Sequence, residues 1–114
     1  ALTSSENEMA SEAKINRALS FSGRDSKAIK SQLLKMLKDD KNIEYFDQIY
    51  YALAEISFKN NLEELGKEQL QKSINLSTNN VPQKIKSMKR MGDLFFEKSQ
   101  YIKSYLYYDS VSVL

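Results

Sequence analysis

The chain has 114 residues, of which 41% are hydrophobic and 28% are charged, and this balance is typical of one folded domain rather than of a disordered tail. Its 17 basic and 15 acidic residues leave a formal charge of +2, which is too balanced to favour a nucleic-acid or membrane surface. The sequence contains no His and no Cys, so nucleophiles paired with His, disulfides and the usual zinc sites are excluded.

The composition favours an all-α fold. Three Gly and one Pro are few for an all-β fold, which needs many tight turns. Long stretches rich in Leu, Lys, Glu, Gln and Ala favour helices instead. No apolar run approaches the roughly 20 residues that are needed to span a bilayer.

The first part of the chain, about 8–39, is predicted to be a pair of helices. Residues 11–21 have helical spacing, and the turn at 22–25 contains Gly23 and a possible N-cap, Asp25. A second amphipathic helix is expected over 26–39. Its inward face consists of Ile29, Leu33, Met36 and Leu37.

The second pair of helices, 47–77, has the strongest signal. Residues 48–59 and 62–76 both have helical spacing, and two Asn residues, which tolerate a left-handed backbone, separate them. Asn61 followed by Glu64 has the spacing of a capping box, so Asn61 is expected to cap the second helix. The predicted inward stripe of the first helix is Tyr50, Leu53, Ala54 and Ser57.

A third pair is expected over 81–113. Pro82 suits the first turn of a helix, because its missing N–H costs nothing there. Ser99 and Gln100 form the predicted turn before the last helix. The stripe of the first helix is Ile85, Met88, Met91, Gly92 and Phe95. The prediction is one domain, 1–114, with six helices in three antiparallel hairpins.

The second and third hairpins repeat the same residue classes at a constant offset. Met88 follows Tyr50, and Ser104 follows Gly66, by 38 positions (88 − 50 and 104 − 66). Large, small and aromatic residues at these spacings resemble the tetratricopeptide repeat (TPR). Gly66 and Ser104 stand where that repeat has alanine, and Ser57 where an aromatic is usual. The resemblance implies a short right-handed superhelix that acts as a protein–protein interaction scaffold.

A narrower resemblance concerns several short strings of residues. They look like the TPR part of the PorW/SprE-type lipoproteins of the type IX secretion and gliding-motility machinery. The strings are 47–56, 77–80 with 83–84, 93–96 and 107–110. The resemblance implies a periplasmic subunit that contacts other secretion components and is a segment of a longer protein. Its outer-membrane anchor would lie in a part not included here, because no lipid-bearing Cys is present.

Nothing in the sequence favours catalysis. The neighbouring acids Asp39–Asp40 and Glu63–Glu64 would point about 100° apart on a helix, so they cannot face each other as catalytic carboxylates. No glycine-rich phosphate loop is present. We therefore expect no enzyme activity, no cofactor and no metal.

A binding groove is the functional alternative to an ordinary solvated face. Tyr51, Glu55 and Lys59 form a mixed ladder that Lys86, Lys89 and Asp93 would continue on the next repeat. Aromatic residues off the core stripe would anchor an extended or helical peptide. The candidate groove residues are Tyr51, Glu55, Phe58, Lys59, Lys86, Lys89, Asp93 and Phe96.

Two further surfaces, a basic cluster and the apolar last helix, could contact binding partners. The basic cluster Lys84, Lys86, Lys89 and Arg90 would be partly neutralised by Asp93 and Glu97 one turn on, which makes nucleic-acid binding weak. The last helix is apolar on several sides, which predicts self-association or a neighbouring repeat. If only flanking repeats contact the chain, it is a structural spacer of a longer solenoid. The apolar residues are Tyr105, Leu106, Val111, Val113 and Leu114.

Overall fold

The computed structural model describes residues 13, 15 and 26–114, and in this part of the chain all regular structure is helical. The all-α prediction is therefore confirmed. The helix predicted over 11–21 lies outside the described residues, except for Ala13 and Ile15, which are both helical. The elements are α2 (Ser26–Leu37), the 3₁₀ helix η1 (Asp40–Tyr45), α3 (Phe46–Lys59), α4 (Glu63–Leu76), α5 (Val81–Glu97) and α6 (Tyr101–Ser112).

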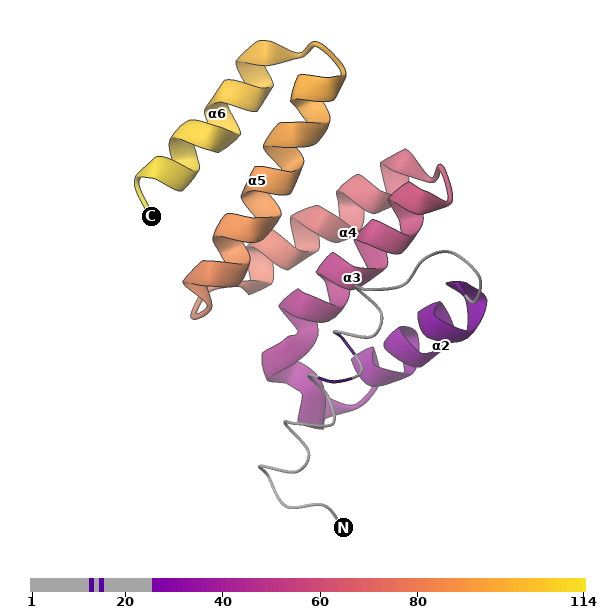
Figure 1. Cartoon of the computed structure of the whole chain (residues 1–114). Coiled ribbons are helices and arrows are strands. Elements are labelled where there is room, and N and C mark those ends of the chain that lie inside the picture. The colour runs from indigo at the N-terminus through magenta and orange to yellow at the C-terminus, as the bar shows by residue number, and fades with distance from the viewer. Residues whose placement is uncertain (1–12, 14, 16–25) are drawn as a thin grey trace.

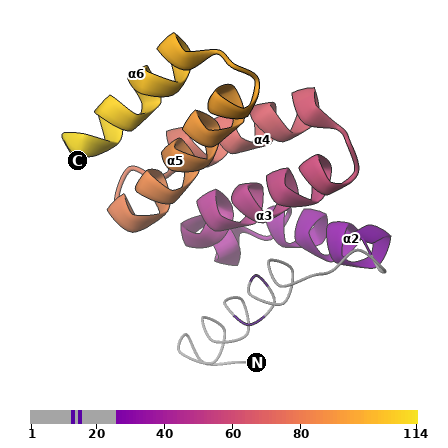
Figure 2. The ribbon, with the colours of Figure 1, turned by 45° about the horizontal axis from the view of Figure 1, so that its top comes forward.

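The helices form a row in chain order, from α2 at one end to α6 at the other (Figures 1 and 2). The chain reverses direction between α3 and α4 and again between α5 and α6, and these two pairs make the most extensive helix–helix contacts. Contacts of α2 with α3, and of α4 with α5, connect the row. Among the described helices, none is long and apolar enough to cross a membrane.

Two buried clusters hold this row together. The first joins α2, η1 and α3 and also takes in Ile15, which is 1% exposed. The predicted inward residues Leu33 and Met36 belong to it, and Ile29 and Leu37 pack against it half-buried. The second cluster joins α3, α4 and α5. It contains Tyr51, Ala54, Leu70, Ile74, Met91 and Leu94.

Helix α3 ends in a left-handed turn that begins the chain reversal. Asn61 has φ of 62°, the Leu62 N–H donates to the Ser57 carbonyl at 2.8 Å, and the Asn61 N–H donates to the Phe58 carbonyl at 3.1 Å. This pattern of bonds is the Schellman motif, which satisfies the last carbonyls of a helix. The left-handed turn predicted at the two Asn residues is confirmed.

The prediction that Asn61 caps α4 is wrong. The N-cap of α4 is Leu62, and no side chain accepts a hydrogen bond there. Asn61 terminates the preceding helix instead, so its side chain is not placed at the start of the next one. Glu64 forms an ion pair with Lys67 at 3.2 Å rather than completing a capping box.

The same reversal recurs 38 positions later (99 − 61). Ser99 has φ of 59°, the Gln100 N–H donates to the Phe95 carbonyl at 2.8 Å, and the Ser99 N–H donates to the Phe96 carbonyl at 3.0 Å. The bond from Gly66 N–H to the Leu62 carbonyl also has its counterpart, from Ser104 N–H to the Gln100 carbonyl. The repeat inferred from side-chain classes is therefore present in the backbone of the two turns.

Glycine is expected to stabilise the second turn. Replacing Ser99 by Gly should raise the free energy of unfolding by about 0.5–1 kcal/mol, since a serine Cβ is strained at positive φ. The same change at Asn61 should gain less, because Asn tolerates this conformation better. Urea unfolding of both variants measures whether the Ser99 variant gains more stability than the Asn61 variant. A loss of stability in the Ser99 variant would contradict the left-handed turn.

The connections from α2 to α3 and from α4 to α5 contain details that helical spacing does not show. After α2, Asp39 accepts a hydrogen bond from the Lys41 N–H at 3.0 Å and caps η1. The buried Asn42 side chain donates to the Met36 carbonyl at 3.0 Å and holds η1 against α2. Before α5, Asn80 accepts from the Gln83 N–H at 3.3 Å. Pro82 lies in the first turn, as predicted.

Candidate protein-interaction face

Helices α3 and α5 contact each other across the row, and the eight candidate groove residues lie on these two helices. We name this surface the α3–α5 face. Its members on α3 are Tyr51, Glu55, Phe58 and Lys59, and those on α5 are Lys86, Lys89, Asp93 and Phe96. The fold therefore brings two sequence-distant segments together, as the repeat offset predicts, but the eight side chains have different surroundings.

Tyr51 is a packing residue in this structure and not an open anchor. It is 8% exposed and belongs to the buried cluster that joins α3, α4 and α5. The Lys86 Nζ lies 4.9 Å from the centroid of its ring and covers it from α5. Burial raises the pKa of Tyr51 above its ordinary value; Glu55 and Asp93 add to the rise, and Arg90 opposes it.

Glu55 is joined to α5 by an ion pair that the sequence pattern missed. Its Oε1 accepts from the Arg90 Nε at 2.7 Å, and about a quarter of each side chain is exposed. The same guanidinium lies 4.9 Å from the centroid of the Phe58 ring. The expected pairing of Arg90 with Asp93 or Glu97 is wrong, because Arg90 reaches across to α3 instead of along its own helix.

Asp93 is directed toward α6. The Tyr108 hydroxyl donates a hydrogen bond to the Asp93 Oδ1, and this bond raises the pKa of Tyr108. Gly92 allows the close approach, because a Cβ there would lie 2.6 Å from a ring carbon of Tyr108. The sequence pattern predicts that Asp93 continues the charged ladder together with Lys86 and Lys89. Asp93 instead accepts a hydrogen bond from α6.

The exposed part of the α3–α5 face carries three lysines, one carboxylate and one aromatic side chain. Lys59, Lys86, Lys89 and Asp93 are exposed, whereas Glu55 is partly buried in its ion pair with Arg90. Phe96 is 56% exposed. Its ring meets the ring of Tyr101 edge-on at a centroid distance of 5.4 Å, a neighbour that the sequence did not indicate.

The Glu55–Arg90 ion pair should couple α3 to α5. We expect a double-mutant cycle with Glu55→Gln and Arg90→Met to give a coupling free energy of about 1 kcal/mol, because the pair is partly buried and its geometry is good. Chemical unfolding of the two single variants and the double variant measures it. The exposed pair Lys67–Glu64 serves as the control, for which about 0.3 kcal/mol is expected. Equal coupling in the two cycles would contradict the role of Arg90 as a link between helices.

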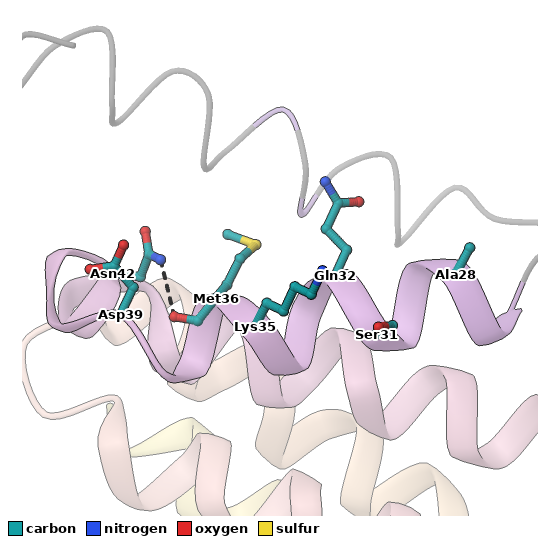
Figure 3. A pocket seen from close by; sticks show the side chains of 7 residues that line it. All are labelled: Ala28, Ser31, Gln32, Lys35, Met36, Asp39 and Asn42. Atoms are coloured by element: carbon teal, nitrogen blue, oxygen red, sulfur yellow. Dashed lines mark hydrogen bonds between the residues drawn. The ribbon is translucent and has the colours of Figure 1, made fainter. Parts of the chain in front are cut away.

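A separate hollow of about 500 Å³ lies beside α2 and η1, away from the α3–α5 face. Figure 3 shows its lining along one side of α2 and at its C-terminal end, with the Asn42–Met36 hydrogen bond at one side. The lining residues are Ala28, Ser31, Gln32, Lys35, Met36, Asp39 and Asn42. Among the described residues, no group of three or more His, Cys, Asp and Glu side chains could hold a metal ion.

The fold and the face together define a compact, all-helical protein with an internal recurrence of one helix–turn–helix geometry. Comparison of the chain with protein-family models, with curated proteins and with solved structures finds no match. Its function must therefore be inferred from its own residues.

Proposed function

We propose that this protein is a non-catalytic scaffold for protein–protein interaction, of the tetratricopeptide type. The observation that carries the proposal is the recurrence of the Schellman turn. Asn61 and Ser99 have the same backbone conformation and the same surrounding hydrogen bonds, 38 positions apart (99 − 61). Two units with the same turn and the same order of large and small residues are typical of repeats that stack to build a binding surface.

In this proposal the chain forms three antiparallel hairpins, about 8–39, 47–77 and 81–113, in a right-handed superhelix. Two features of the contacts support such a stack. Helix α4 contacts α5, so the second helix of one unit meets the first helix of the next. Helix α3 also contacts α5, so the first helices of neighbouring units lie side by side and share one face.

The proposed ligand of the α3–α5 face is an extended or helical polypeptide segment. Phe96 supplies an exposed aromatic contact at one end of the face. The exposed lysines of the face, Lys59, Lys86 and Lys89, outnumber its one exposed carboxylate, Asp93, while Glu55 is paired with Arg90. This arrangement favours a segment with acidic residues around an apolar side chain.

The narrower resemblance supports a proposal about the cellular role. The strings at 47–56 and 93–96 suit a periplasmic component of a type IX secretion and gliding-motility machine, with an outer-membrane anchor in another part of a longer protein. Fractionation of source cells with an antibody against residues 26–114 tests it. Recovery with the outer membrane and with secretion components is expected. Recovery only in the cytoplasm would contradict this role.

A structural spacer is the second candidate. Tyr51 is covered by Lys86, and Glu55 is paired with Arg90, so these side chains of the α3–α5 face already have partners within the chain. A spacer needs only such internal contacts, and its partners are the flanking repeats.

Partner capture distinguishes the scaffold from the spacer. The face variant is Lys86→Glu, Lys89→Glu and Phe96→Ser, and the matched control changes two lysines and one exposed leucine of α2: Lys27→Glu, Lys30→Glu and Leu34→Ser. Both variants should keep the circular dichroism of the original protein, because none of the six residues is buried. The face variant should unfold at a somewhat lower temperature, because Lys86 covers the Tyr51 ring and Phe96 meets the Tyr101 ring, so capture is compared at a temperature where both variants are folded.

We expect the original chain and the α2 control to capture the same partner from an extract of the source, and the face variant to lose it at least tenfold. Equal capture by a folded face variant would reject the α3–α5 face and favour the spacer.

A further inference from the structure

Residues 26–38, which contain α2, have lysines but no acidic residues. They include four Lys and no Asp or Glu, although the formal charge of the whole chain is only +2. The rest of the chain therefore has a net charge of −2 (+2 − 4). This local excess of positive charge is hidden in the total, and it favours an anionic partner for this segment.

The four lysines lie on the side of α2 that is opposite its buried side. Successive residues of an α-helix are turned by about 100°, which places all four within an arc of roughly 140°. Leu33 and Met36 lie outside this arc, buried in the cluster with α3. Leu34, 41% exposed, lies within the arc. We name the surface made by Leu34 and the four lysines the α2 face; the lysines are Lys27, Lys30, Lys35 and Lys38.

The charge of the α2 face is not neutralised by neighbouring carboxylates. Among the described residues, no Asp or Glu forms an ion pair with a lysine of this face. Lys30 is half-buried, and the other three lysines are exposed. Asp39, the next acidic residue along the chain, caps η1 by accepting a hydrogen bond from the Lys41 N–H. The basic cluster of α5 differs in this respect, because its Arg90 is paired with Glu55.

We propose that the α2 face binds the surface of a membrane that contains anionic lipids. Such a surface presents many negative charges over a broad plane, and lysines on one side of a helix reach it together. The flexible lysine stems extend to the headgroups, while Leu34 enters the boundary between headgroups and acyl chains. The remaining net charge of −2 is repelled, so the chain binds with α2 toward the membrane.

Nucleic acids and acidic polypeptides fit this face less well. A hollow of about 320 Å³ lies among its side chains, and none of the described residues that line it is aromatic, so a base has no ring to stack on. All four cations are Lys, whereas Arg is the residue that binds single phosphates with two hydrogen bonds. The aromatic contact for a polypeptide, Phe96, lies on the α3–α5 face instead. The membrane contact therefore does not depend on the proposed scaffold function.

Co-sedimentation of the whole chain with vesicles tests the proposal. We expect binding to vesicles of equal parts phosphatidylcholine and phosphatidylglycerol, and no binding to phosphatidylcholine alone. Raising the salt concentration from about 0.1 M to about 1 M should remove most of the binding, because the screening length falls from about 10 Å to about 3 Å. A chain that does not bind the anionic vesicles, or that binds duplex DNA in preference to them, would overturn the proposal.

Charge reversal locates the contact on the chain. In the variant Lys27→Glu with Lys38→Glu, the partition coefficient should fall at least about 100-fold, because each lysine near an anionic surface contributes about a factor of five and each new carboxylate is repelled. The control, Lys72→Glu with Lys103→Glu on α4 and α6, has the same change in total charge and should lose less than about tenfold. Circular dichroism checks that both variants are folded. Equal losses would contradict the proposal, because binding would then follow the total charge.

A fluorescent probe tests the position of Leu34. The chain contains no Trp, so one introduced Trp reports only its own surroundings. In the Leu34→Trp variant, the emission should shift to shorter wavelength with the anionic vesicles, because Trp favours the membrane–water boundary. The control is Leu62→Trp, at a leucine 46% exposed in the turn between α3 and α4, and no shift is expected there. No shift at position 34, or an equal shift at both positions, would show that the membrane does not select the α2 face.

Discussion

Replacing Leu70 by Ala should lower the free energy of unfolding by about 2–5 kcal/mol, because it opens a cavity in the cluster that joins α3, α4 and α5. Leu70 is 0% exposed, and its neighbours in that cluster come from α3 and α5 as well as from α4 itself. For a domain of this size such a loss is a large part of the total stability.

The matched control for this change is Leu65→Ala in the same helix. Leu65 is 36% exposed, so removal of its side chain should cost less than about 1 kcal/mol. Urea unfolding followed by circular dichroism gives the two free energies. Equal costs at the two positions would show that α4 is not held against α3 and α5 as described.

Replacing Gly66 by Val should be the second most damaging change, with a loss of about 2–3 kcal/mol. A Cβ at this position would lie within van der Waals overlap of the Phe58 ring, with one ring carbon at 2.6 Å and another at 2.9 Å. Gly66→Ala should cost less, because the gain in helix propensity of about 1 kcal/mol offsets part of the overlap.

Removal of the opposing ring tests the specific contact. In the background of Phe58→Ala, the Gly66→Val change should cost at least about 1 kcal/mol less than it does alone, because the added methyl groups then meet open space. If the free-energy losses of the two substitutions simply add in the double variant, contact with the Phe58 ring is not what makes a larger side chain unfavourable at position 66.

The helices themselves could be predicted from the sequence because their apolar spacing and their breaks agree. Leu33, Met36, Leu53 and Ala54 are buried as expected, and the break at residues 60–61 is where α3 ends. The recurrence at 38 positions was visible in the side-chain classes and holds for the hydrogen bonds around Asn61 and Ser99. These features depend on local spacing, which a single sequence records.

The side-chain partners on the candidate face could not be predicted in the same way. Arg90 has acidic residues one turn along its own helix, but it pairs with Glu55 on α3. Tyr51 looked like a groove residue because it lies off the stripe of Tyr50 and Leu53, yet α3 is covered on more than one side and Tyr51 is buried. Which acidic side chain pairs with Arg90 depends on how neighbouring helices cross. Helical periodicity within one segment does not contain that information.

The N-cap of α4 also could not be predicted from local residue preferences alone. Asn61 has a side chain suited to an N-cap, but its backbone is in the left-handed conformation that terminates α3. One residue cannot serve both helix ends across so short a turn.

Hydrogen exchange of the chain with its captured partner tests most directly whether the α3–α5 face holds other polypeptides. We expect the partner to slow exchange in α3 and α5, with the strongest effect near Lys89 and Phe96, and to leave α2 unchanged. Protection confined to α2 or to the outer side of α4, with α3 and α5 unaffected, would contradict this account.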